Sequence, residues 1–399
     1  MLASLALIFL VGLAMGALCG QLKLPRIIGM LITGIVLGPY VLDFLDPSIL
    51  SISSELRKIA LIIILLKAGL SLDIKDLKKA GRPAVLLSFV PASCEIIGYV
   101  LLAPVILGVN TVEAAIMGAV LAAVSPAVVV PRMVMLMEQK YGTKKAIPQM
   151  IMAGASCDDI FVIVLFTTFL SMAQGGSAHI MDFVNIPVSI VLGILLGIVF
   201  GLILYLFFET SYAHKHCVRN SIKVIIVLGC SFLLVSIEGW LENKISVSGL
   251  LAVVSMACTL KMKSTAFVSK RLSEKFGKLW IAAEVMLFVL VGAAVDIRYT
   301  LSAGFSALLM IIVALLFRTV GVLICTAKTN LTAKERAFCV IAYLPKATVQ
   351  AAIGSVPLAA GLGCGKIVLS VAVLAIVVTA PLGAIGIDNT YKRWLEKEK

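Results

Sequence analysis

The chain has 399 residues, of which 61% are hydrophobic and only 14% are charged, and its mean hydropathy is +1.11. These charged residues are too few to cover a water-exposed protein of this length, which excludes a soluble enzyme. The formal net charge is +13, but the basic residues lie in short loops between hydrophobic segments, so nucleic acid is not an expected partner. The nine cysteines are scattered singly, and we expect neither a disulfide framework nor a cofactor.

Thirteen hydrophobic segments are predicted to cross the membrane as helices, because a span needs about 20 apolar residues. The fold class expected from them is an all-α polytopic membrane protein. The first segment lacks a basic start, so it is predicted to be a retained helix and not a signal peptide. The predicted spans are 2–20, 27–42, 56–72, 83–107, 113–137, 147–171, 186–209, 218–237, 246–262, 280–296, 303–326, 335–360 and 364–386.

The distribution of Lys and Arg predicts the orientation of these spans. Counted together with the basic residues near the ends of the adjacent spans, the odd-numbered loops and the C-terminal tail carry 26 of the 34 basic residues, and the even-numbered loops carry 5. Basic loops stay in the cytoplasm. We therefore expect the N-terminus outside and the tail inside, in a cell (inner) membrane.

Five charged residues lie deep inside the predicted spans. Each charge at the bilayer centre costs at least about 2.5–3.5 kcal/mol, so these side chains are expected to face one another or a water-filled cavity. They are the first functional candidates: Glu95, Asp158, Asp159, Arg318 and Lys346.

Two halves of the chain form a weak internal repeat. Ala68-Gly-Leu-Ser-Leu-Asp-Ile74 and Val291-Gly-Ala-Ala-Val-Asp-Ile297 correspond at an offset that also places Glu95 on Arg318. The loop charges put the two units in opposite orientations, as in the inverted repeats of secondary transporters. Glu95 and Arg318 are expected to meet between the repeats, and a fixed salt bridge is favoured over a role as ion carriers.

Prolines predict that two spans are broken helices. Pro126 and Pro131 lie inside the fifth span, and Pro345 lies at a nearly corresponding place in the twelfth. Proline removes a helical hydrogen bond, and the freed carbonyls must find partners in protein, water or ions. The alternative is a simple proline kink at each place.

The adjacent acids of the sixth span suggest a cation site. Neighbouring helix positions are about 100° apart, so Asp158 and Asp159 point in different directions. We expect Asp159 to bind either Na⁺ or a proton, Asp158 to pair with Lys346, and Ser125 and Ser156 to supply further oxygen ligands. Lys346 either releases a proton when Na⁺ arrives or compensates the negative ends of the half-helices.

Three motifs resemble the NHA-type branch of the monovalent cation:proton antiporter superfamily. They are Ser125-Pro-Ala-Val-Val-Val-Pro131, Ser156-Cys-Asp-Asp159 and Leu344-Pro-Lys-Ala-Thr-Val-Gln-Ala-Ala-Ile-Gly354. The resemblance implies a Na⁺ or Li⁺/H⁺ antiporter with a mobile six-helix core that works as an elevator, usually as a homodimer. It also implies that Asp159 is the ion-binding aspartate and that Asp158 is its partner.

Two departures from the family pattern affect the expected stoichiometry. Val124-Ser125-Pro126 stands where the wider family often has Thr-Asp-Pro, and Arg318 stands where electrogenic members keep a lysine. The number of protons exchanged per cation is therefore one or two.

The expected domain organisation follows the repeats. Scaffold and dimerisation helices with the start of the first repeat occupy 1–82, and further scaffold helices with an amphipathic connector occupy 172–302. The two halves of the core occupy 83–171 and 303–386, and a short cytoplasmic tail occupies 387–399.

Two other sequence features concern partners. The connector, Lys261 to Lys278, carries six basic residues and is expected to contact anionic lipids on the cytoplasmic face. Glycines spaced by four residues on the first and seventh spans suit either a dimer face or packing inside one protomer. These glycines are Gly12, Gly16, Gly20, Gly193, Gly197 and Gly201.

Other functions compete with this hypothesis. A K⁺/H⁺ exchanger or an organic-anion/Na⁺ symporter keeps the fold and changes the cargo. An intramembrane aspartyl protease also needs two acids, but they must face one water from separate helices. A channel is disfavoured by the absence of a carbonyl filter sequence. A transporter, and not an enzyme, is therefore expected.

Overall fold

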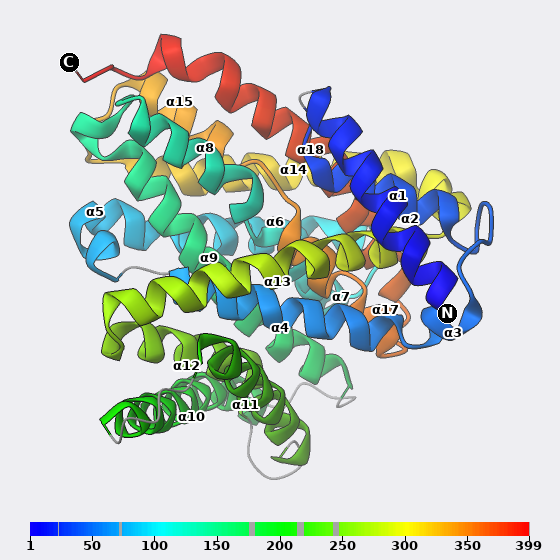
Figure 1. The fold of residues 1–399 in the computed structure, drawn as a ribbon. Helices are drawn as coiled ribbons and strands as arrows, with labels where there is room; N and C mark the ends of the chain where they lie inside the picture. The colour runs from blue at the N-terminus through cyan, green and yellow to red at the C-terminus, as the bar shows by residue number, and fades with distance from the viewer. Residues whose placement is uncertain (23, 72–73, 175–179, 214–218, 242–246, 399) are drawn as a thin grey trace. The chain divides into compact units, whose positions relative to one another are not determined.

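The computed structural model describes residues 1–22, 24–71, 74–174, 180–213, 219–241 and 247–398, and the regular elements in these ranges are helices (Figure 1). The predicted all-α class is confirmed. The helices are α1 (Leu2–Gln21), α2 (Arg26–Leu37), α3 (Pro47–Ser51), α4 (Ser53–Ser71), α5 (Ile74–Leu87), α6 (Val90–Leu107), α7 (Thr111–Ala122), α8 (Pro126–Glu138), η1 (Thr143–Lys145), α9 (Ile147–Gln174), α10 (Ile180–Ala213), α11 (Asn220–Leu241), α12 (Gly249–Lys263), α13 (Ala266–Ala293), α14 (Ile297–Thr326), α15 (Ala333–Ala342), α16 (Thr348–Ile353), α17 (Val356–Ala359) and α18 (Gly365–Trp394).

Each predicted span coincides with a helix or with a group of shorter helices. Within the described ranges, eight helices are long and apolar enough to cross a membrane. The fifth and twelfth predicted spans are divided into shorter helices, because the chain unwinds inside them. The count of thirteen crossings therefore stays a prediction.

The chain folds into two compact units, each assembled from segments that are far apart in the sequence. Unit 1 contains residues 1–57, 73–174 and 285–399, and unit 2 contains residues 58–72 and 175–284. Both predicted core halves, 83–171 and 303–386, lie in unit 1. All five deep charged residues of the sequence therefore belong to one unit.

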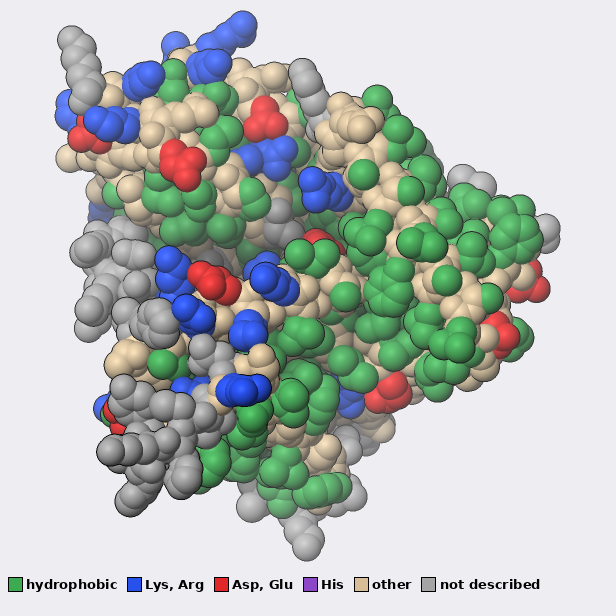
Figure 2. All heavy atoms as spheres, viewed as in Figure 1, with side chains coloured by type: hydrophobic (Ala, Val, Ile, Leu, Met, Phe, Trp, Pro, Cys, Tyr) green, Lys and Arg blue, Asp and Glu red, His purple; other side chains and the backbone are tan. Residues whose placement is uncertain are grey.

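The surface of unit 1 is uneven in charge. Figure 2 shows Lys and Arg side chains gathered over the end that carries α8, α15 and the C-terminus, whereas the surface over α1 and α2 is largely hydrophobic. The exposed apolar side chains of α1 include Leu10, Leu13 and Leu18. Apolar side chains of this size on a helix surface suit contact with lipid.

The two glycine ridges pack inside the chain. In unit 1, a Cβ on Gly12 would lie 2.9 Å from Val285, and one on Gly16 would lie 3.2 Å from Met30. In unit 2, a Cβ on Gly197 would lie 2.3 Å from the carbonyl oxygen of Ala252. The close approach of neighbouring helices explains the ridges, so the packing alternative holds for both of them.

The internal repeat is visible in how matching helices begin. The Asn110 side chain accepts from the N–H of Glu113, and the Glu113 carboxylate accepts from the N–H of Asn110, both at 2.9 Å. Thr332 and Glu335 form the same capping box at the start of α15. The first half of each broken helix therefore starts in the same way. Asp73, which the sequence comparison used, lies outside the described residues.

The contact between α6 and α14 is pseudo-symmetric, because matching residues of the two repeats make similar contacts. Glu95 and Arg318 are separated by 223 residues, and so are Gly98 and Gly321. A Cβ on Gly98 would lie 2.9 Å from the ring of Phe317, and a Cβ on Gly321 would lie 2.7 Å from the backbone of Pro91. Each glycine lets the partner helix approach, and this approach brings Glu95 and Arg318 together.

Two boundaries differ from the sequence expectation. The predicted connector, Lys261 to Lys278, includes the end of α12 and the first part of α13, one continuous helix that also contains most of the tenth predicted span. Leu272 and Phe276 are buried there, whereas Lys270 and Arg271 are exposed, so that stretch is amphipathic as expected. The side chain of Phe267 lies outside the described set. At the other boundary, α18 continues to Trp394, past the predicted start of the tail at 387.

Candidate ion-binding site

The first break separates α7 from α8. α7 ends at Ala122, Ala123 and Ser125 have extended backbone, and Pro126 begins α8. Proline is favoured at the first position of a helix, because the N–H it lacks would have no helical partner there. Pro126 therefore starts the second half-helix. The prediction that Pro131 contributes to the break is wrong, because Pro131 lies inside the uninterrupted α8.

The second break lies between α15 and α16 and contains Pro345. α15 ends at Ala342 and α16 begins at Thr348. The N–H of Ser125 donates a hydrogen bond of 2.8 Å to the carbonyl of Pro345. The two breaks therefore cross and are joined through their backbones.

Basic side chains donate hydrogen bonds to the backbone carbonyls that have no helical partner at the breaks. Arg318 donates to the carbonyl of Ala122 at the end of α7, and its Nε donates to the carbonyl of Tyr343, 2.7 Å away, at the end of α15. Lys346 donates to the carbonyl of Leu121. A positive charge is stabilised at a helix C-terminus. Arg318 thus caps both half-helices, and Lys346 lies at the end of α7, as the charge-compensating alternative predicts.

Glu95 binds both bases. Its Oε2 lies 2.6 Å from Arg318 Nη1, and its Oε1 lies 2.7 Å from Lys346 Nζ, and all three side chains are buried. The expected contact between Glu95 and Arg318 is therefore present. The predicted pairing of Lys346 with Asp158 is wrong. Lys346 reaches Glu95 and the end of α7, whereas Asp158 is bound by other groups.

Asp158 is tied to the first break. Its Oδ2 accepts a hydrogen bond of 2.8 Å from the N–H of Val124 and lies 3.4 Å from Arg318 Nη2. Its second oxygen is buried without a hydrogen-bond partner. Asp158 therefore holds the unwound backbone in place and leaves one oxygen for a ligand.

Asp159 is buried but has no such fixing contacts. Its Oδ1 lacks a hydrogen-bond partner, and in the described part of the chain no base lies within ion-pair distance of its carboxylate. The hydroxyl oxygen of Ser125 is also buried without a partner. Ser156 lies on α9, but its side chain is outside the described set. Buried oxygens without a hydrogen-bond partner in the described residues thus include those of Asp158, Asp159 and Ser125, together with Gln350 Oε1 and Thr348 Oγ1 on α16.

The sequence reasoning missed Gln350. This side chain is fully buried on α16, and its Nε2 donates to the carbonyl of Ala123, 2.9 Å away, and to that of Leu121, 3.4 Å away. It therefore links the second broken helix to the first. A buried amide inside an otherwise apolar span was the available signal, because such a group needs a partner. Thr379 was missed as well, and its hydroxyl accepts from the N–H of Lys346.

The charges of the cluster do not cancel. Glu95, Asp158 and Asp159 are acids, Arg318 and Lys346 are bases, and all five are buried. The ionised cluster therefore has a formal charge of −1, and Asp159 is its unpaired acid. Burial of an unbalanced charge is costly, so the cluster favours one added monovalent cation or one added proton.

Comparisons with known proteins show the family and the fold of the chain. A family model described as sodium/hydrogen exchanger, transmembrane, matches residues 5–391. Sodium/hydrogen exchanger 9B2 from Homo sapiens is 35% identical, over 99% of this chain and 75% of that protein. Sodium/hydrogen exchanger 9B1 from Mus musculus is 33% identical, over 94% of this chain and 67% of that protein. The sodium proton antiporter MjNhaP1 from Methanocaldococcus jannaschii has the same fold, with a TM-score of 0.84 at 20% identity over 98% of each chain. The chain therefore belongs to the transmembrane sodium/hydrogen exchanger family, within the superfamily that its motifs resemble.

Proposed function

We propose that this chain is a secondary-active antiporter that exchanges one Na⁺ for one proton, and that both ions bind in turn to Asp159. One observation carries the proposal: Asp159 is the buried acid of the cluster for which the described residues supply no basic partner. Na⁺ and H⁺ each supply the missing positive charge. Because one carboxylate serves both ions, occupancy by one excludes the other.

The fixed contacts of the other charges support a ratio of one to one. Arg318 stays protonated at any physiological pH. Lys346 is held by Glu95 and by the Leu121 carbonyl. Asp158 is held by Val124 and Arg318. Asp159 is then the single group that changes its proton during the cycle, which makes the exchange electroneutral.

The oxygens beside the break suit a small hard cation. Asp159, Asp158 and Ser125 each offer a buried oxygen without a protein donor, and hard cations prefer such ligands. Li⁺ shares this chemistry with Na⁺ and is proposed as a second substrate. K⁺ is the alternative cation, and an organic anion is disfavoured because the unpaired group is itself negative.

An elevator movement of the core halves, 83–171 and 303–386, completes the proposal. The bond between Ser125 and Pro345 and the bonds of Arg318 tie both breaks into one body, so the site would move with its helices. We further propose scaffold roles for 1–82 and 172–302, a homodimer, anionic lipids at the start of α13, and an inner-membrane location. The basic loops support a cytoplasmic tail and an external N-terminus.

A protease mechanism fits the cluster poorly. Asp158 and Asp159 are neighbours on α9, and an oxygen of Asp158 is already held by the N–H of Val124. A protease needs two carboxylates that share one water from opposite sides. The Asp158 carboxylate instead binds the backbone N–H of Val124.

Transport by purified protein in liposomes tests the function. A pH gradient is imposed, NaCl, LiCl or KCl is added, and the internal pH is followed. Na⁺ and Li⁺ are expected to drive proton movement that Asp159→Asn abolishes. Asp43→Asn is the matched control, because Asp43 is exposed and has a φ of 52°, which asparagine tolerates. Wild-type transport by Asp159→Asn would refute the assignment, and a response to K⁺ alone would select the alternative cargo.

A further inference from the structure

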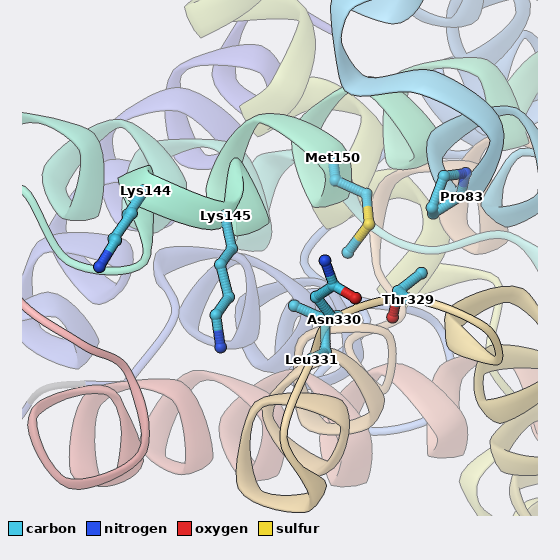
Figure 3. A pocket seen from close by; sticks show the side chains of 7 residues that line it. All are labelled: Pro83, Lys144, Lys145, Met150, Thr329, Asn330 and Leu331. Carbon is cyan, nitrogen blue, oxygen red and sulfur yellow. The ribbon is translucent and has the colours of Figure 1, made fainter.

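A pocket of about 270 Å³ lies in unit 1 between loops of the two repeats, and no residue of the charged cluster lines it (Figure 3). Lys144 and Lys145 of η1 line one part of it, and Thr329 and Asn330 of the loop between α14 and α15 line another. Pro83, Met150 and Leu331 supply an apolar wall. These loops are among those that the basic residues predict to be cytoplasmic.

The two lysines of the pocket differ in how firmly they are paired. Lys145 Nζ donates to both carboxylate oxygens of Glu335, at 2.7 and 3.0 Å, and Glu335 is buried. Lys144 Nζ lies 3.6 Å from Glu396, and the two side chains are 67% and 56% exposed. An exposed pair at this distance contributes little. Lys144 is therefore the ammonium that a ligand can recruit.

Arg336 is a further basic residue that contacts the loop between α14 and α15. Arg336 Nη2 donates to the carbonyl of Thr329 over 3.2 Å, and its Nε is buried without a hydrogen-bond partner. Lys145 is paired with the buried Glu335, and Arg336 adds a second positive charge on the Thr329 side of the pocket. The pocket side chains that carry N–H donors are Lys144, Lys145 and Asn330.

We propose that this pocket binds a phosphate-bearing anion, with Lys144 as the ammonium that contacts it. Phosphate offers several acceptor oxygens and one or two negative charges, which match the ammonium and amide donors. The volume is slightly below the about 300 Å³ at which pockets for drug-sized ligands begin, so a single head group fits better than a nucleotide. The source is either the phosphodiester of an anionic lipid or free phosphate.

The C-terminal segment competes with this ligand. The N–H of Gly142 donates to the carbonyl of Glu396 over 2.8 Å, and the Thr143 hydroxyl donates to a carboxylate oxygen of Glu398 over 2.6 Å. These bonds hold the Glu396 carboxylate near Lys144, where it occupies the place of an external anion. Ligand binding therefore takes Lys144 from Glu396 and joins a loop of the first repeat to a loop of the second.

Thermal unfolding of the purified, detergent-solubilised chain tests the site with three probes. They are dioctanoyl phosphatidylglycerol, dioctanoyl phosphatidylcholine, and potassium phosphate measured against potassium chloride at equal ionic strength. A saturable rise of Tm is expected with phosphatidylglycerol, with phosphate, or with both, and which of them acts identifies the source. Absence of a saturable rise with either, or an equal rise with phosphatidylcholine, would overturn the proposal.

Two variants are expected to change ligand binding in opposite directions, and a third is the control. Lys144→Gln removes a charged donor and is expected to weaken binding about tenfold. Glu396→Gln removes the competitor and is expected to strengthen binding about two- to threefold. Lys366→Gln is the control, because Lys366 is exposed near the start of α18 and does not line the pocket. Wild-type affinity in Lys144→Gln, or weaker binding in Glu396→Gln, would contradict the assignment.

Discussion

The backbone N–H of Ser125 donates to the backbone carbonyl of Pro345, so each broken helix supplies one partner of the bond at their crossing. Neither side chain takes part, and the contact depends on both helices being unwound at that point. Arg318 adds a second link, because it caps the ends of α7 and α15 together. The site is thus held by backbone groups that, in a continuous helix, would form hydrogen bonds within that helix.

Competition at Asp159 predicts how Na⁺ affinity changes with pH. A proton on Asp159 must leave before Na⁺ binds, so the apparent KM for Na⁺ rises as pH falls. The rise is expected to approach about tenfold per pH unit when the carboxylate is mostly protonated, as for any single-proton competitor. Initial rates in liposomes at several pH values measure it. A KM that is independent of pH would contradict a shared site.

Removal of the Glu95 charge is expected to destabilise the fold strongly. Glu95→Gln leaves Arg318 and Lys346 buried with less compensation, and breaking a buried ion pair costs about 3–5 kcal/mol. The thermal unfolding of purified protein checks this. Glu55→Gln is the control, because Glu55 is exposed at the start of α4. Equal Tm values for the two variants would show that Glu95 is not needed to hold the bases.

Gln350 is expected to affect transport through the backbone of the first break. Gln350→Leu leaves the carbonyl of Ala123 unpaired, at a cost of about 1–3 kcal/mol, and loosens the segment that positions Asp158. We expect a higher KM for Na⁺ with a smaller change in kcat. Gln350→Met, which keeps the length of the side chain but has no donor, should behave like Gln350→Leu. An unchanged KM in both variants would remove this positioning role.

Two glycines of α14 predict opposite effects of the same substitution. A Cβ on Gly321 would meet the backbone of Pro91 at 2.7 Å, whereas one on Gly304 would meet nothing within 4 Å. Gly321→Ala is expected to push α6 from α14 and lower Tm. Gly304→Ala should raise stability by up to about 1 kcal/mol, because alanine is the better helix former. Similar Tm changes in both variants would contradict the close approach.

The sequence predicted the charged cluster because a deep charge is rare enough in a membrane protein to need a partner. Glu95 and Arg318 were paired correctly because the repeat aligned them. The predicted partner of Lys346 was wrong, because the direction of the Lys346 side chain depends on how the chain unwinds at the second break. Residue types at Pro345 and Lys346 do not specify that direction. The prediction that Pro131 breaks its helix was also wrong, because a proline can lie inside a helix when the neighbouring residues tolerate the lost backbone hydrogen bond.

The least predictable parts were contacts made by backbone atoms. The carbonyls of Leu121, Ala122 and Ala123 bind Lys346, Arg318 and Gln350, yet these three residues look like ordinary apolar helix positions in the sequence. Unwinding gives them chemistry that their side chains lack. The prolines indicated where the helices break, but only the geometry shows which basic side chains bind the backbone carbonyls there.

Charge movement during Na⁺ exchange tests the central claim most directly. In liposomes with a Na⁺ gradient, proton flux is measured with and without a membrane potential clamped by K⁺ and valinomycin. One-for-one exchange at Asp159 predicts the same flux at every clamped potential, and no flux in Asp159→Asn. A flux that changes steeply with potential would show that a second titrating group, such as Lys346, carries a proton and would contradict the account.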